Sequence, residues 1–139
     1  MIIEILIGFA LAAISILAVR AIFKQKDHAF WRQGLILAAL VYVGFALCLG
    51  GTGNWIGIEL GGVVLYGVIA YMAKGRRYAI LALGWGLHIL WDVLLHSGGH
   101  PTYVPHWYPG VCIGFDIAIA LYIGSKLLNT STSQTVSPS

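Results

Sequence analysis

The sequence predicts an all-α fold, a membrane bundle of five transmembrane helices. Of 139 residues, 59% are hydrophobic and only 9% are charged, whereas soluble domains carry about 25% charged residues. The apolar residues form five runs, each close to the roughly 20 residues that a spanning helix needs. We therefore expect a single transmembrane domain over residues 1–128, followed by a disordered Ser/Thr-rich tail over residues 129–139.

The first two helices are predicted over residues 2–23 and 33–49. The first run lacks the basic start and the small-residue cleavage pattern of a secretory signal, and it contains Glu4, so we interpret it as a span. It ends at the polar segment Lys24–His28. The second run ends at the glycine-rich turn Gly50–Asn54.

The remaining helices are predicted over residues 55–73, 78–97 and 111–128. The basic segment Lys74–Arg77 separates the third run from the fourth. A loop that contains three prolines, residues 98–110, separates the fourth run from the fifth. Five spans therefore follow from the polar and turn-forming segments between the apolar runs as well as from the hydropathy of the runs.

The basic residues predict the orientation of the chain. In a five-helix arrangement all eight Lys and Arg residues fall on one side of the membrane. The positive-inside rule then places the N-terminus outside the cell and the C-terminus in the cytoplasm. Because these residues flank apolar runs instead of lining a soluble face, a nucleic-acid partner is not expected. The expected location is the cell membrane.

Four of the five acidic residues lie inside predicted spans, on four different helices. They are Glu4, Glu59, Asp92 and Asp116. At a rise of 1.5 Å per residue, all four lie roughly 5 to 8 Å below the outer boundary of the membrane. No Lys or Arg of the sequence is predicted at that depth, so these carboxyl groups must be protonated, hydrated or neutralised by a cation. The sequence thus predicts an outward-facing polar pocket.

His88, Asp92 and His96 are spaced four residues apart on the fourth helix. On an α-helix they fall within roughly 80° of arc, where imidazole and carboxylate groups can bind one divalent ion. We expect a divalent metal, with zinc as the leading candidate and with His88, Asp92, His96 and Asp116 as its ligands. The alternative is a hydrogen-bond network that joins the helices.

Asp92 and Glu59 are the candidate catalytic residues, because a carboxylate beside a metal-bound water can act as a general base. The prolines of the fourth loop restrict its backbone and favour a lid over the pocket. The loop also fits an interfacial aromatic belt, so both interpretations stay open. The residues expected to surround or cover the pocket are Tyr66, Trp85, His100 and His106.

The two cysteines, Cys48 and Cys112, both lie near the predicted outer side. They can form a disulfide in an oxidising compartment or remain two free thiols. The small-residue motifs Gly57-x3-Gly61 and Gly110-x3-Gly114 favour close helix packing, within the monomer or in a homo-oligomer.

The segment Gly86–His96, followed by His100-Pro101, Trp107-Tyr108-Pro109 and Phe115-Asp116, resembles a family of small bacterial and fungal integral membrane proteins of unknown function. The similarity covers about the last 55 residues and implies a membrane protein with a polar cluster. A fainter similarity links the chain to intramembrane zinc hydrolases of the alkaline ceramidase and adiponectin-receptor type. Those proteins have seven helices and other ligand spacings.

These observations favour a metal-dependent hydrolase that acts on a lipid or another amphipathic substrate from the bilayer. One alternative is a proton- or cation-coupled transporter, since buried acids mark ion pathways. Apart from Arg20 and Lys126 near their ends, the predicted cytoplasmic halves of the helices lack ionisable residues, which counts against a continuous path. Another alternative is a structural or accessory subunit whose polar cluster only holds the helices together.

Overall fold

The computed structural model describes residues 1–23, 26–96 and 102–135, and it is all-α. Five of its helices are long and apolar enough to cross a membrane, which confirms the predicted fold class. In chain order the elements are α1 (Ile2–Phe23), α2 (Asp27–Cys48), α3 (Gly53–Met72), α4 (Tyr78–Trp91), the π-helical turn η2 (Asp92–His96) and α5 (Tyr108–Thr135).

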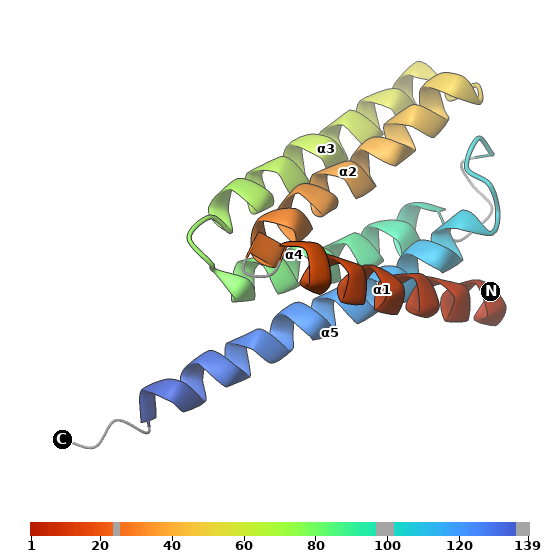
Figure 1. The fold of residues 1–139 in the computed structure, drawn as a ribbon. Helices are drawn as coiled ribbons and strands as arrows, with labels where there is room; N and C mark the ends of the chain where they lie inside the picture. The colour runs from red at the N-terminus through yellow and green to blue at the C-terminus, as the bar shows by residue number, and fades with distance from the viewer. Residues whose placement is uncertain (24–25, 97–101, 136–139) are drawn as a thin grey trace.

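The helices form two groups that face each other (Figure 1). Helices α2 and α3 pack as an antiparallel hairpin, and α5 packs against both α1 and α4. Gly50, with φ 85°, lies in the turn that closes this hairpin, and Gly75, with φ 74°, lies in the turn between α3 and α4. Both turns use the left-handed backbone region that glycine adopts without a steric penalty.

Helix α1 crosses α5 at very short range. A Cβ atom at Gly114 would lie 2.0 Å from the carbonyl oxygen of Ile5, and one at Gly8 would lie 2.1 Å from a backbone oxygen of α5. The close packing expected at Gly114 is therefore present within the monomer. Around Gly57 and Gly61, a Cβ would meet no described atom within 4 Å.

Helix α2 begins at Asp27 instead of the predicted Gln33. Asp27 is buried because it contacts the far end of α5. Tyr122 donates a hydrogen bond of 2.9 Å to its carboxylate, and Lys126 forms an ion pair with the same oxygen. These contacts explain why the helix continues through polar residues that the hydropathy pattern assigns to a loop.

Helix α5 is longer than the predicted span over residues 111–128. It begins at Tyr108 and continues to Thr135, into the segment expected to be a tail. Residues 136–139 of that tail lie outside the described residues.

The interior contains two apolar clusters. The larger joins all five spanning helices through aromatic and aliphatic side chains, with Trp31, Leu35, Trp85 and Ile119 at most 2% exposed. The smaller lies near the α2–α3 turn, where Tyr103 and Val104 of the loop before α5 pack onto Tyr42 and Ala46. Cys48 and Cys112 are both free thiols in this structure. The polar groups of the site contact Tyr66 of the larger cluster and Tyr42 of the smaller one.

Candidate functional site

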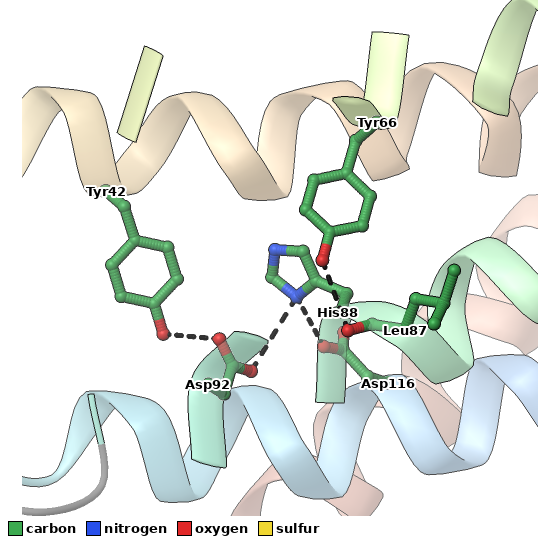
Figure 2. A network of polar contacts seen from close by, with 6 residues as sticks. All are labelled: Tyr42, Tyr66, Leu87, His88, Asp92 and Asp116. Carbon is green, nitrogen blue, oxygen red and sulfur yellow. Dashed lines mark hydrogen bonds and ion pairs between the residues drawn. The ribbon is translucent and has the colours of Figure 1, made fainter. Parts of the chain in front are cut away.

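Three ionisable side chains from α4, η2 and α5 meet in the interior. His88, Asp92 and Asp116 are each at most 2% exposed. His88 Nδ1 lies 2.7 Å from Asp116 Oδ2 and 3.6 Å from Asp92 Oδ2 (Figure 2). One ligand atom from each of the three residues lies within 4.8 Å of the others, so the three can hold a metal ion. We call this set the His88–Asp92–Asp116 group.

The helix changes from an α-helix to a π-helical turn at Asp92, between the group and His96. Four residues of an α-helix exceed one full turn by about 40°. A π-helix has more residues per turn, so four residues fall short of a full turn instead. The change of period at Asp92 therefore brings His96 back toward the direction of His88, and His96 is separated from the group by its position further along the helix axis, where it meets Glu59 of α3. Such turns are frequent at functional sites.

Two tyrosines from the opposite helices contact the group. Tyr42 of α2 is fully buried and donates a hydrogen bond of 2.7 Å to Asp92 Oδ1. Tyr66 of α3 packs against the His88 ring at a centroid distance of 4.9 Å and donates to the carbonyl oxygen of Leu87 at 3.1 Å. Figure 2 shows both tyrosines pointing toward the His88–Asp92–Asp116 group. The position expected for Tyr66, beside the pocket, is the one it occupies.

His96 and Glu59 form a second buried network. His96 Nε2 lies 2.8 Å from Glu59 Oε1, and Tyr103 donates a hydrogen bond of 2.6 Å to the same oxygen. Burial, together with the hydrogen bond to Glu59, raises the pKa of the Tyr103 hydroxyl above its ordinary value of 10.0. Tyr42 links the two networks, because its ring stacks on His96 at a centroid distance of 4.0 Å.

Three polar atoms of these networks have no hydrogen-bond partner among the described residues. They are Asp92 Oδ2, His88 Nε2 and His96 Nδ1. An unsatisfied buried polar group costs about 1–3 kcal/mol, and more when the group is charged. In Figure 2, His88 Nε2 points away from both aspartates, whereas Asp92 Oδ2 points toward Nδ1. This carboxylate oxygen, which lacks a hydrogen bond, therefore lies on the side where the three ligand atoms converge.

The three carboxyl groups of the two networks outnumber the groups among their described partners that can carry a positive charge. Asp92, Asp116 and Glu59 contact two imidazoles and two tyrosine hydroxyls. The side chain of Lys126 pairs with Asp27, at the opposite end of α2. A cation or bound protons can balance this charge, since an isolated carboxylate is strongly disfavoured in a low-dielectric interior.

Of the other residues predicted around the pocket, Trp85 lies near the group and His106 does not. Trp85 is buried beside the group, and its indole nitrogen has no partner in the described part of the chain. His106 is exposed and lines a shallow cleft with Glu4, which forms an ion pair with the N-terminal amino group. Glu4 therefore does not join the other acids. His100 lies outside the described residues.

Three contributors were missed from the sequence. Tyr42 and Tyr103 complete the two networks, and Asp27 forms its own buried cluster at the other end of the bundle. A tyrosine within an aliphatic run carries a weak signal, because a buried hydroxyl usually finds a partner. Asp27 gave no such signal in the sequence, because an aspartate in a predicted loop is expected to be solvated.

Comparison with known families gives one finding. Residues 1–130 match a family described as a family of unknown function, DUF6010. No match is found among curated proteins or among solved structures.

Proposed function

The chain belongs to the DUF6010 family, and we propose that it binds a divalent metal ion, zinc in the first instance, through His88, Asp92 and Asp116. The observation that carries the proposal is the fully buried Asp92 Oδ2, which makes no hydrogen bond among the described residues and lies 3.6 Å from His88 Nδ1. Zinc binds imidazole and carboxylate at about 2.0–2.2 Å, so two of its ligand atoms lie about 3.3–3.6 Å apart. The 3.6 Å separation fits that spacing.

Binding requires one local change. The 2.7 Å contact between His88 Nδ1 and Asp116 Oδ2 is a hydrogen-bond distance, and the proton on Nδ1 must leave before that atom can bind a metal. A small rotation of the Asp116 side chain then suffices to open the contact. We therefore expect binding to release a proton and to weaken as the pH falls.

With the ion in place, we propose a hydrolytic reaction on an amphipathic substrate taken from the bilayer. A bound metal ion lowers the pKa of a coordinated water, which becomes a nucleophile at neutral pH. Glu59 is the proposed general base, and His96 and Tyr103 hold its carboxylate through hydrogen bonds. Tyr42 holds Asp92 and contacts His96, which keeps the two networks in register.

The proposed orientation places the site in the outer half of the membrane. Support comes from the basic residues, which cluster around Lys74–Arg77 and the α1–α2 connection, at the opposite end of the bundle from Tyr42 and Glu59. Cys48 is exposed at the end of α2 and supplies the test. A membrane-impermeant maleimide should label Cys48 in intact cells. Labelling only after permeabilisation would indicate the opposite orientation, with the N-terminus in the cytoplasm.

The metal proposal is tested by the metal content of the purified protein and by zinc titration of the metal-free protein. We expect one zinc per chain in the wild type and a loss in Asp92→Asn. Asp27→Asn is the matched control, because Asp27 is a second buried aspartate at the other end of α2. Equal zinc binding by the wild type and Asp92→Asn, or none by either, would overturn the assignment.

A further inference from the structure

A cleft of about 320 Å³ lies between α1, α2, α4 and α5, next to the His88–Asp92–Asp116 group. Its lining on α2 extends from Phe30 to Val41, which is about 16 Å at 1.5 Å per residue. Most of the lining is aliphatic or aromatic, and Asp116 lines it from α5. The volume is within the range of about 300–1,000 Å³ that small-molecule sites occupy.

The cleft borders the surface that faces lipid in a membrane. Leu37 lines it and is 62% exposed, and Phe30 lines it and is 37% exposed. Both belong to α2, which is long and apolar enough to span. A hydrocarbon chain in the bilayer can therefore reach the cleft without passing through water.

Two residues of the lining carry indole N–H groups that have no acceptor among the described residues, and both nitrogens are buried beneath the wall of the cleft. Trp31 and Trp85 both line the cleft, are at most 2% exposed, and have indole nitrogens without an acceptor in the part of the chain that the structure describes. Their rings lie 6.4 Å apart, and each is within 6.4 Å of the Phe115 ring, the neighbour of Asp116 in sequence. Buried indole N–H groups usually find a partner.

We infer that this cleft binds one acyl chain of a membrane lipid, with a neutral ester or amide carbonyl near Trp31 and Trp85. The apolar lining accepts the chain, and a turn of either indole ring toward the cleft would bring its unpaired N–H to an oxygen acceptor. A phosphate or a free carboxylate is disfavoured there because Asp116 lines the same space. A neutral carbonyl satisfies the donors without that repulsion.

The inference deepens the proposed function and rests on it only for the chemistry. Asp116, one of the proposed metal ligands, lines the same cleft as Trp31 and Trp85. The acyl ester or acyl amide would then be the substrate class. Binding itself requires only the cleft, so it is expected to persist without metal.

The test measures quenching of Trp31 and Trp85 by a brominated acyl ester. Protein is reconstituted in vesicles of ether-linked phosphatidylcholine with a chelator present, and Trp55, Trp91 and Trp107 are replaced by Phe. The ester is titrated against a brominated alkyl ether of equal chain length. We expect saturable quenching by the ester and binding at least about tenfold weaker for the ether, since each 1.4 kcal/mol is tenfold.

Two glycines of α2 supply matched variants. Gly34 lines the cleft and a Cβ there would contact Trp85 at 3.4 Å, so Gly34→Leu should fill the space and abolish saturable quenching. Gly44→Leu is the control, because a Cβ at Gly44 meets no described atom within 4 Å. The inference would be overturned if the ester and the ether quenched equally and without saturation in the control Gly44→Leu as well as in Gly34→Leu.

A second measurement uses the chain with all its tryptophans in place, in case the triple replacement impairs folding. A photoactivatable diazirine acyl ester should crosslink to lining residues of α2 and α5, and less so in Gly34→Leu. Crosslinks spread evenly over all lipid-facing helices would refute the site. Because the chelator removes metal, failure of the metal proposal leaves both readouts unchanged.

Discussion

Replacing Tyr42 with Phe isolates one hydrogen bond of the site. The ring, which stacks on His96, is retained, and only the hydroxyl that donates to Asp92 at 2.7 Å is lost. Because Asp92 Oδ2 already has no partner among the described residues, both oxygens of this buried carboxylate would then be unsatisfied. Hydrogen bonds to charged groups contribute about 1.5–3 kcal/mol, so the free energy of unfolding should fall by about that amount.

The same substitution should weaken metal binding. A residue that orients a metal ligand typically changes affinity by about 10- to 100-fold when it is removed. Unfolding in mixed detergent micelles measures stability, and competition with a fluorescent chelator measures zinc affinity. Tyr71→Phe is the control, because Tyr71 is 67% exposed on α3 and its hydroxyl should contribute within about 0.5 kcal/mol.

The outcomes separate two roles of Tyr42. A loss of stability with unchanged zinc affinity would mean that the hydrogen bond is structural and that Asp92 is not a ligand. If Tyr42→Phe behaves like Tyr71→Phe in both assays, the reasoning about the unsatisfied carboxylate is wrong.

Two further predictions concern packing and pH. Gly114→Ala should destabilise the protein by about 1–3 kcal/mol, since its Cβ would lie 2.0 Å from the Ile5 carbonyl oxygen. Gly124→Ala on the same helix is the control, because a Cβ there has space and should not destabilise the protein. Equal unfolding curves for the two variants would contradict the close crossing of α1 and α5. Because the folded-state pKa of Tyr103 is raised above 10.0, its contribution should be full below pH 10 and decline as the pH rises further. The stability difference between the wild type and Tyr103→Phe should therefore shrink above pH 10, and a constant difference would contradict the hydrogen bond to Glu59.

The sequence was sufficient for the fold class, because hydropathy and the clusters of Lys and Arg residues separate five spans without tertiary information. Local boundaries were less predictable. Asp27 looks like a loop residue until its contacts with Tyr122 and Lys126 on α5 are known. A contact across so many residues leaves no trace in a local hydropathy window.

The sequence predicted many of the residues of the site, but it did not predict how they are grouped. Spacing placed His88, Asp92 and His96 on one stripe, and the structure divides them between two networks. His88 meets Asp116 of α5, and His96, more than one turn further along the helix axis, meets Glu59 of α3, so the division depends on which helices pack at each height. Partners from other helices, such as Tyr42, depend on packing and lie beyond what one helix can reveal.

The crossing of α1 and α5 has a consequence for biogenesis. Helix α1 leaves the ribosome well before α5, yet it packs against α5 through the close approaches at Gly8 and Gly114. Asp116 also belongs to α5. The His88–Asp92–Asp116 group can therefore form only after α5 has been made, and a nascent chain that stops at η2 lacks one of its three members.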